Sequence, residues 1–409
     1  MGWYRFLVGW LGVALLSLTP AVSGDSTATL RISTEPGEAE LRIDGEPYGI
    51  SPQRTRDTFM VRLPPGTYAI EAKIPAEDTD HGEPMRAERE VTLRADTEQT
   101  FHLTLSGPGD PLASYREHRD AVRAVASLPD GRVLTASADR RIKLWRLEDG
   151  QVLRTYPGHA AAVNAVTASA DGRSFLSGDA AGVVKLWQTD RDQAQRTLVE
   201  ADSPIRALAL SPRGQRALVA TEAGKLQLWD TASGRQLRTF REQQAAFHAV
   251  TYDSDGARAL SAGAGDEPLV LWNATYGRAI GAFAPDESGP VEAVAFTPRG
   301  RHALAGTQSG AVKLWQLDRG HLALRLEGHR AEVVAVAVSP DGRRALTGAR
   351  DGTLKLWPLD AEPEDDEPIE PLRRYLGHDR AVRGVAFSGD GARGVSVGED
   401  RRLRLWQVD

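Results

Sequence analysis

Seven tryptophans divide most of the chain into segments of nearly equal length. They stand at positions 145, 187, 229, 272, 315, 357 and 406, at intervals of 42, 42, 43, 43, 42 and 49 residues. Six of them end a short run such as IKLW, VKLW or LRLW, and the remaining one, Trp272, ends the run LVLW. A tight turn such as Pro129-Asp130-Gly131 lies upstream of each run. Because chance does not place seven copies on one spacing, the chain is built from a repeated unit.

A repeat of about 40–45 residues with four short strands per unit is typical of the blades of a β-propeller. Two further motifs agree with this. Gly-His precedes the expected innermost strand at Gly158-His159, Gly328-His329 and Gly377-His378, and Trp-Asp occurs at Trp229-Asp230. Over residues 112–409 the chain therefore resembles the WD-repeat family. The resemblance implies a seven-bladed propeller that binds partners on its loop faces and at the mouth of its central channel.

The resemblance also implies a hydrogen-bonded network inside a blade, made by a His, a strand hydroxyl, an Asp and the repeat Trp. A buried Asp needs such partners, and the His nitrogen and the Trp N–H can supply them. Three blades contain the full set: His118, Thr135, Asp139 and Trp145; His329, Thr347, Asp351 and Trp357; and His378, Ser396, Asp400 and Trp406. Ala181, Ala223 and Ser309 replace the Asp elsewhere, Asp266 keeps it, and blades three to five lack the His.

A His/Asp/Ser set also resembles a catalytic triad. Here the set recurs from blade to blade with the Trp beside it, which favours a structural role. Each His lies in a different blade, so we expect no metal site among them. The sequence also contains no phosphate-binding P-loop and no HExxH. These observations predict a protein that is not an enzyme and needs no cofactor.

One position in each blade is a candidate binding position, the first polar residue after the apolar start of the inner strand. An apolar strand that admits Arg at this position is expected to end at the solvent-exposed channel mouth. The position holds Arg123, Asn164, Arg206, His248, Glu292, Val334 and Arg383. Three arginines and a histidine around one opening favour an acidic or carboxylate-bearing partner. The alternative is a set of solvated rim residues without a partner.

The sequence predicts how the ring closes. The last Trp is followed by only three residues, so the last blade has no fourth strand of its own. Residues 112–116 match the fourth strands of other blades, such as VLRTY and LRRYL. We expect this segment to complete the last blade, which would remove an open sheet edge.

Residues 25–106 have a different pattern, in which apolar and polar residues alternate with period two. Strands are expected at 28–34, 39–45, 67–74, 88–95 and 99–105, with a polar, acidic loop at 74–84. The region resembles the PEGA domain, an extracytoplasmic β-sandwich that carries no catalytic residues. The matching residues are Pro36, Gly37, Ala39, Asp44, Gly45, Gly49, Ser51, Pro52, Pro65, Gly66 and Tyr68. Residues 107–111 read as a Gly/Pro linker to the propeller.

The first 24 residues have the pattern of a secretory signal, with Arg5, an apolar stretch over residues 6–18, and small residues at Ala21 and Ser23. The apolar stretch is short for a membrane-spanning helix, which needs roughly 17–25 residues. A cleaved signal is therefore expected. An uncleaved anchor and an ordinary buried segment remain open.

Charge and composition exclude several classes of protein. The net charge of −6 gives no basic footprint for nucleic acid, and the absence of cysteine removes disulfides and Cys-ligated zinc. Residues 25–106 carry a net charge of −7. The long interval before Trp406 holds an acidic insertion at residues 361–371, which is a solvated loop or, alternatively, a calcium ligand set.

The sequence therefore predicts an all-β chain, a small β-sandwich followed by a seven-bladed β-propeller. We expect a monomeric, exported, non-enzymatic scaffold of a bacterial cell envelope that binds envelope proteins. Contact with the membrane is expected only if the N-terminal segment is uncleaved. The alternatives are a carbohydrate or cell-wall binding protein and, third, an envelope hydrolase. Seven of the nine tryptophans belong to the repeats and two to the first 24 residues, which leaves none for a sugar-stacking platform.

Overall fold

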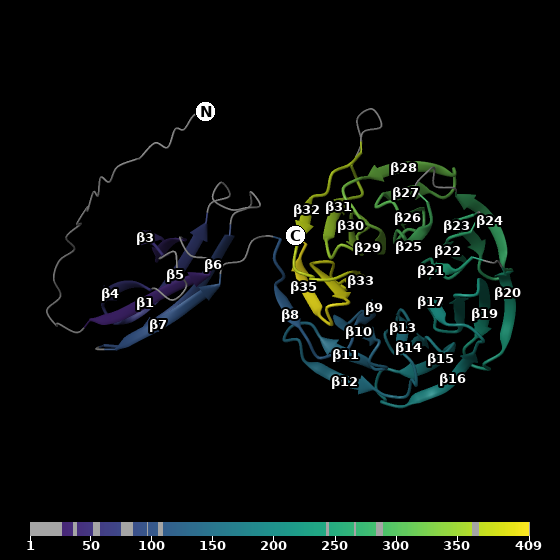
Figure 1. Ribbon diagram of the computed structural model, residues 1–409, viewed down its shortest axis with the longest axis horizontal. Coiled ribbons are helices and arrows are strands. Elements are labelled where there is room, and N and C mark those ends of the chain that lie inside the picture. Colours follow the sequence, from purple (N-terminus) through teal and green to yellow (C-terminus); the bar gives the residue numbers. More distant parts are fainter. Residues whose placement is uncertain are drawn as a thin grey trace, which may run out of the picture. The chain divides into compact units, whose positions relative to one another are not determined.

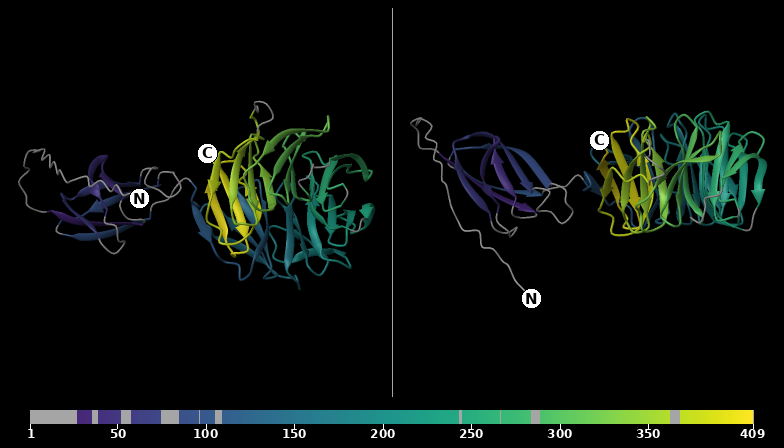
Figure 2. Two further views of the ribbon diagram at one scale, coloured as in Figure 1. Left: turned by 45° about the horizontal axis from the view of Figure 1, so that its top comes forward. Right: turned by 90° about the horizontal axis from the view of Figure 1, so that it is seen from above.

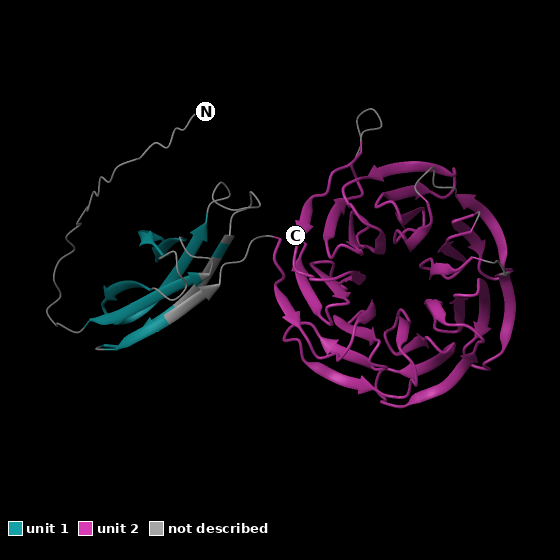
Figure 3. Cartoon of the chain, in the orientation of Figure 1, with its two compact units in different colours: residues 1–107 teal, residues 108–409 magenta. Residues whose placement is uncertain are grey.

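The computed structural model describes residues 27–35, 39–51, 58–74, 85–95, 97–104, 109–242, 245–265, 267–283, 289–361 and 368–408. The chain forms two compact units, Met1–Gly107 and Pro108–Asp409 (Figure 3). Several features discussed above lie outside the described residues: the expected signal, Pro36, Gly37 and Pro52 of the PEGA-like match, Asp266, and residues 362–367 of the acidic insertion.

The first unit is a sandwich of two sheets, with strand orders β4-β1-β7 and β3-β2-β5-β6 (Figure 1). The strands are β1 (Ala28–Glu35), β2 (Glu40–Ile43), β3 (Glu46–Ile50), β4 (Phe59–Leu63), β5 (Gly66–Ile74), β6 (Met85–Leu93) and β7 (Glu98–Thr104). Alternate side chains of both sheets fill one core, in which Leu30, Ile32, Leu41, Ile43 and Ile70 are at most 2% exposed. The expected β-sandwich is confirmed.

Polar side chains hold the turns of this unit. Asp44 and Gly45 form the β2–β3 turn with positive φ values of 50° and 82°. The Asp44 Oδ1 atom accepts a hydrogen bond from the Ala69 N–H at 2.7 Å. Ser51 Oγ accepts one from the Ala39 N–H at 2.9 Å. Asp44 and Ser51 are therefore held by hydrogen bonds to backbone N–H groups of other segments, 25 and 12 residues away along the chain.

The second unit contains seven four-stranded antiparallel sheets within its described residues, arranged as a ring (Figure 1). The inner strands are β9 (Val122–Ser127), β13 (Val163–Ala168), β17 (Ile205–Leu210), β21 (Phe247–Tyr252), β25 (Val291–Phe296), β29 (Val333–Val338) and β33 (Val382–Phe387). The second strands are β10 (Arg132–Ser137), β14 (Ser174–Asp179), β18 (Arg216–Thr221), β22 (Arg258–Gly263), β26 (His302–Thr307), β30 (Arg344–Ala349) and β34 (Arg393–Gly398).

The repeat tryptophans end the third strands, which are β11 (Ile142–Arg146), β15 (Val183–Gln188), β19 (Lys225–Asp230), β23 (Leu269–Asn273), β27 (Val312–Gln316), β31 (Leu354–Pro358) and β35 (Leu403–Gln407). The outer strands are β12 (Val152–Tyr156), β16 (Ala194–Glu200), β20 (Gln236–Glu242), β24 (Arg278–Phe283), β28 (His321–Leu326), β32 (Arg373–Tyr375) and β8 (Ala113–Tyr115). The predicted seven-bladed architecture is confirmed.

The second strand is the most buried strand of every blade, because sheets pack on both of its faces. Its last five residues are buried in all seven blades. Small residues let neighbouring blades approach closely. Gly178 lies against Ile205 and Gly348 against Val382, so a Cβ atom at either glycine would press on the next blade.

The ring closes as predicted. Strand β8 pairs with β35 of the last blade, with Tyr115 opposite Leu403 and Ala113 opposite Leu405. The Leu112 N–H also donates to the Leu405 carbonyl at 2.7 Å. An early segment of the propeller thus supplies the outer strand of its last blade. This pairing covers the edge that β35 would otherwise expose.

Antiparallel strands place the connections of the ring on two faces (Figure 2). The inner strands begin at the face that we name face A. It also carries the turns between second and third strands and the connections from one blade to the next. The inner strands end at face B, which carries the turns between first and second and between third and fourth strands. A residue's place along its strand therefore fixes its face.

The acidic insertion lies between β31 and β32, as expected. Its described end contacts the neighbouring blade. The Ile369 N–H donates to the Arg325 carbonyl at 2.8 Å, and the Glu327 N–H donates to the Ile369 carbonyl at 3.3 Å. Ile369 therefore extends the sheet of blade five beyond its outer strand β28.

Candidate functional site

The candidate binding residues occupy one structural position, the second residue of each inner strand. In blade two, Val163 and Ala165 pair with the consecutive residues Asp179 and Gly178, so Asn164 between them is left out of the ladder. The same register shift occurs in the other six blades. We name these bulged residues the rim set: Arg123, Asn164, Arg206, His248, Glu292, Val334 and Arg383. A β-bulge turns a side chain away from the regular alternation of the strand.

The rim set surrounds the axis of the ring at face A, because it lies near the start of the seven inner strands (Figure 1). Several of its members join neighbouring blades. Arg123 Nη1 donates to Asn164 Oδ1 at 2.5 Å, and Asn164 Nδ2 donates to the Ile205 carbonyl at 2.9 Å. His248 Nδ1 lies 3.1 Å from Glu292 Oε2, at ion-pair distance but without hydrogen-bond geometry.

Two rim arginines face carboxylates that the sequence analysis missed. Arg206 Nη2 lies 3.1 Å from Glu222 Oε1, and Arg383 Nη2 lies 2.5 Å from Glu399 Oε1. Both glutamates directly follow a second strand, β18 or β34. Aligning the residue after each second strand would have revealed them. Neighbouring carboxylates therefore offset two of the three rim arginines, which reduces the positive charge at this opening.

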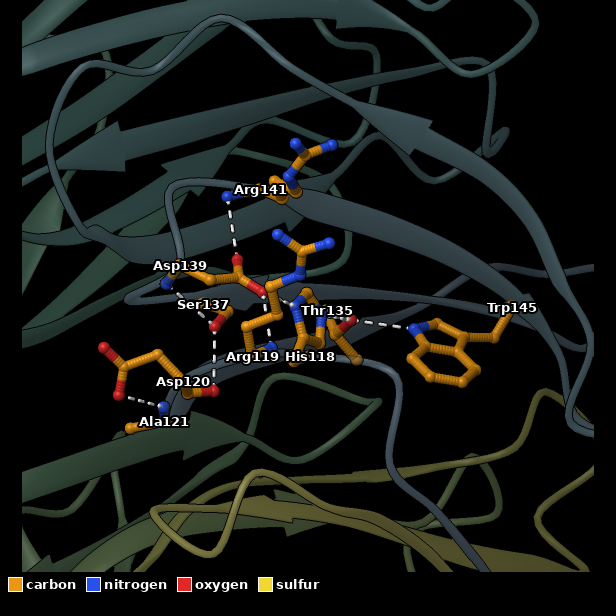
Figure 4. Close-up of polar contacts among 9 residues, drawn as sticks. All are labelled: His118, Arg119, Asp120, Ala121, Thr135, Ser137, Asp139, Arg141 and Trp145. Atoms are coloured by element: carbon orange, nitrogen blue, oxygen red, sulfur yellow. Dashed lines mark hydrogen bonds and ion pairs between the residues drawn. The ribbon is translucent and has the colours of Figure 1, made fainter.

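The network of blade one holds His118 between two partners (Figure 4). His118 Nδ1 lies 2.8 Å from Asp139 Oδ2, and its Nε2 lies 2.7 Å from Thr135 Oγ1. Trp145 Nε1 donates to the same hydroxyl oxygen at 2.8 Å. Blade seven repeats this arrangement, with His378 between Asp400 at 2.9 Å and Ser396 at 2.6 Å.

Burial and hydrogen bonding act in opposite directions on these carboxyl groups. Burial raises the pKa of Asp139, but the contact with His118 and the N–H groups of Arg119 and Arg141 outweigh it and lower the pKa to about 2. Burial lowers the pKa of His378, against the opposing effect of Asp400. The networks therefore stabilise an ionised Asp carboxylate beside a buried His imidazole.

Blade two has a complete network that the sequence analysis did not find. Its Asp comes from the end of the second strand and not from the following turn, where Ala181 stands. His159 Nδ1 lies 2.7 Å from Asp179 Oδ2, and its Nε2 lies 2.6 Å from Ser177 Oγ. Trp187 Nε1 donates to Ser177 Oγ at 2.8 Å. The carboxylate of Asp179 thus reaches the network histidine of its blade from a position two residues before Ala181, where the Asp was expected.

The expected contact between His329 and Asp351 in blade six is wrong. Thr353 lies between them, with its Oγ1 3.1 Å from His329 Nδ1 and 2.7 Å from Asp351 Oδ1. In blades one and seven the corresponding residues are Arg141 and Arg402, which supply only a backbone N–H to the Asp. His329 therefore lacks a direct carboxylate, and burial together with nearby Lys355 lowers its pKa to about 4.

The remaining blades keep less of the network. In blade four Trp272 Nε1 donates to Ser261 Oγ at 2.9 Å. Val219 and Ala305 take the hydroxyl position in blades three and five. Trp229 Nε1 in blade three is buried and has no hydrogen-bond partner within the described residues.

The network hydroxyls are unsuited to act as nucleophiles. Thr135, Ser177, Thr347 and Ser396 are 0% exposed. Each oxygen accepts from a Trp N–H while it also contacts an imidazole. A substrate carbonyl cannot approach an oxygen that is enclosed and bonded in this way.

The described residues include no group of three or more His, Asp or Glu side chains arranged to hold a metal ion. They also include no helix with the length and apolar character needed to cross a membrane.

Comparison with known proteins identifies the repeat. The sequence profile of the family "WD domain, G-beta repeat" matches residues 109–146, 150–188, 280–316, 320–358 and 369–407. The chain is 46% identical over 50 residues to "WD repeat-containing protein RUP2" of Arabidopsis thaliana, which covers 12% of this chain and 14% of that protein. It is 41% identical over 63 residues to "Protein Notchless" of Drosophila melanogaster, which covers 15% of this chain and 13% of that protein. The matched segments thus span about one seventh of these relatives. Five segments between residues 109 and 407 are WD repeats, and they belong to a second unit that forms a β-propeller.

Proposed function

We propose that this chain is an exported, non-enzymatic scaffold of a bacterial cell envelope that binds a protein partner at the rim set. The observation that carries the proposal is the bulge repeated in all seven inner strands. It gathers seven side chains, four of them Arg or His, around one opening. WD-repeat propellers typically act as protein-interaction scaffolds, which agrees with this arrangement.

The rim ion pairs are weak enough to be exchanged. The side chains of Arg206 and Glu222 are 48% and 47% exposed, and those of Arg383 and Glu399 are 34% and 35% exposed. Exposed ion pairs of this kind contribute about 0.2–1 kcal/mol. Arg123 is exposed and hydrogen-bonds to the neutral Asn164, so its charge is not offset by a carboxylate within the described residues. A partner carboxylate can therefore bind Arg123 first and compete for the other two arginines.

The tryptophans favour a protein over a glycan as the partner. Trp145, Trp187, Trp357 and Trp406 are 0% exposed. Sugar-binding sites commonly stack an exposed aromatic ring on the sugar. Among the described residues the large exposed aromatic side chains are two tyrosines in different units, Tyr48 and Tyr276, so neither unit holds two of them for a stacking platform. Carbohydrate or cell-wall binding is the alternative function.

We further infer that the first unit is a PEGA-like domain and that the chain acts outside the cytoplasm. The fixed turn at Asp44 and Gly45 and the hydrogen bonds of Ser51 give defined roles to residues of the PEGA-like pattern. Tyr68 of the same pattern donates from its hydroxyl to the Pro64 carbonyl at 2.9 Å. The signal-like pattern of residues 1–24 supports export.

The test is affinity capture of the tagged full chain from its native envelope fraction after mild crosslinking, read by mass spectrometry. A partner recovered in stoichiometric amount should be lost when Arg123, Arg206 and Arg383 are changed to Glu. The control changes Arg173, Arg235 and Arg278 to Glu, which are exposed and lie at connections of face B. The control makes the same change in net charge and should keep the partner. Recovery of glycan fragments without an enriched protein would overturn the proposal.

A further inference from the structure

Face B contains two adjoining cavities at blades four, five and six, far from the rim set along the strands. The first has a volume of about 430 Å³, and Arg258, Arg301, His302 and Arg319 contribute to its lining. The second has a volume of about 630 Å³, and Arg299, Arg301, His302 and Arg343 contribute to its lining. Because Arg301 and His302 line both, the two cavities adjoin at these residues, and we name them together the arginine cleft.

Two of its five arginines are already bound to the protein. Arg258 Nε lies 2.8 Å from Asp253 Oδ2, and Arg258 Nη2 donates to the Gly300 carbonyl at 2.7 Å. Arg343 Nε lies 4.0 Å from Asp360 Oδ2, and both of these side chains are largely exposed. Arg258 thus forms a fixed wall between blades four and five. Arg343 makes only a long, exposed ion pair.

The positive charges of the other three arginines are not neutralised by a carboxylate within the described residues. Arg299, Arg301 and Arg319 are exposed, and none of their guanidinium groups has a hydrogen bond or an ion pair within the described residues. The carboxylates nearby are partly engaged elsewhere. Asp341 Oδ1 accepts from Ser339 Oγ at 2.5 Å and from the Arg343 N–H at 3.0 Å. The cleft therefore presents guanidinium groups without partners.

The turn that carries Arg299 departs from the pattern of the other blades. Five blades place an Asp at this position, and each Asp accepts a backbone N–H of its own turn: Asp130, Asp171, Asp255, Asp341 and Asp390. Blades three and five have Arg213 and Arg299 instead, so these two turns lack the hydrogen bond from a backbone N–H to an Asp side chain. Arg299 lines the cleft, whereas Arg213 is not part of its lining.

We propose that the arginine cleft binds an acidic peptide segment of a partner protein. Guanidinium forks bind carboxylates in a bidentate manner, and Arg301 at the junction of the two cavities can hold one carboxylate while Arg299 and Arg319 hold others. The charged side chains of the lining favour a charged ligand over an apolar small molecule. This site is independent of the rim set, since it lies on the opposite face, at the other ends of the strands.

Charge favours a peptide over nucleic acid. Asp318, Asp341 and Asp360 also contribute to the lining. They repel a continuous row of phosphates but leave spaces for separate carboxylates of a peptide.

The test measures binding of a fluorescein-labelled peptide of alternating Glu, Asp and Gly residues to the full chain by fluorescence anisotropy. Wild-type protein should bind it with a dissociation constant below about 1 mM and more weakly at about 200 mM than at about 50 mM salt. The double variant Arg301→Glu and Arg319→Glu should bind about tenfold more weakly or worse. Arg213→Glu, at the matching turn of blade three, should bind like wild type.

Thermal unfolding of each variant checks that the exposed substitutions leave the fold intact. Equal binding by the double variant and wild type would overturn the proposal, as would the absence of binding by wild type. Equal or tighter binding of inorganic polyphosphate would show that the cleft responds to charge alone, and would also overturn it. Loss of the rim partner does not affect these measurements, so this proposal and the proposed function fail separately.

Discussion

The ring of Tyr115 lies against Gly150 so closely that a Cβ atom at position 150 would overlap it. Tyr115 belongs to β8, which completes blade seven, whereas Gly150 lies in a turn of blade one. The Tyr115 ring also packs on Trp145 of blade one, with ring centroids 6.3 Å apart. The strand that closes the ring therefore touches both blades at the junction.

Gly150→Ala should destabilise the propeller more than Gly131→Ala. Both glycines have positive φ, 68° and 80°, so each substitution carries a backbone cost of about 1–2 kcal/mol. A Cβ atom at position 131 meets nothing within 4 Å, whereas one at position 150 meets Tyr115. Overpacking should add about 1–3 kcal/mol at position 150. Urea unfolding measures both variants.

The Tyr115→Ala background tests the cause of that difference. Without the ring, the additional cost of Gly150→Ala should disappear, while the cost of Gly131→Ala should stay the same. Equal costs for the two glycine variants in the wild-type background would show that β8 does not hold its place against blade one.

Ser396→Ala should destabilise the chain more than Ser261→Ala. Ser396 Oγ accepts from Trp406 Nε1 at 2.8 Å and lies 2.6 Å from His378 Nε2, so its removal leaves two buried groups unpaired. Ser261 Oγ has only the Trp272 N–H as a side-chain partner among the described residues. Each unpaired buried group costs about 1–3 kcal/mol. Similar losses in calorimetry would mean that the His378 contact adds no stability.

Val219→Thr should stabilise blade three. Val219 is 0% exposed and stands where Thr135 accepts the Trp N–H in blade one. A Thr hydroxyl there would accept from Trp229 Nε1, which lacks a partner, and should contribute about 1 kcal/mol.

The matched control is Val397→Thr, at a residue that is also 0% exposed. This substitution buries a hydroxyl group where no unpaired N–H donor is available, and it should lower the free energy of unfolding by about 1–3 kcal/mol. If Val219→Thr destabilises the chain as much as this control, Trp229 does not need an acceptor.

Repetition explains why the propeller could be predicted. A single LW pair carries little information, but seven pairs with matching turns define the blade boundaries and the place of β8. Strands β3 and β4 of the first unit were not predicted. All five residues of β3 are exposed, and Pro47 and Gly49 weaken its pattern, as is common in an edge strand. Such a strand has no buried face to produce an alternation of apolar residues.

The site was harder to predict because it depends on side chains that meet across different positions of the repeat. Alignment by spacing assigned the Asp of each network to one place in the turn. A carboxylate two residues earlier, in Asp179, reaches His159 equally well, and Thr353 separates His329 from Asp351. Glu222 and Glu399 escaped notice because they follow a different strand from the arginines that they face.

Mild acid should destabilise the propeller through His329. Its pKa falls from 6.5 in the unfolded chain to about 4 in the folded one, because burial and Lys355 disfavour the charged ring. Between these values the unfolded chain binds more protons, so the free energy of unfolding decreases as the pH falls. His329 alone should account for a loss of about 2 kcal/mol at pH 5 relative to pH 8. Burial shifts the pKa of His159 and His378 in the same direction.

His329→Gln tests this assignment, because Gln cannot take up the proton but can still hydrogen-bond to Thr347. The variant should lose stability at pH 8 through imperfect packing, yet its free energy of unfolding should fall less steeply than that of wild type between pH 6.5 and pH 4. His321→Gln is the control, since His321 is exposed and should leave the slope unchanged. Chemical denaturation across this pH range gives the slopes, and an unchanged slope in His329→Gln would assign the acid sensitivity to other groups.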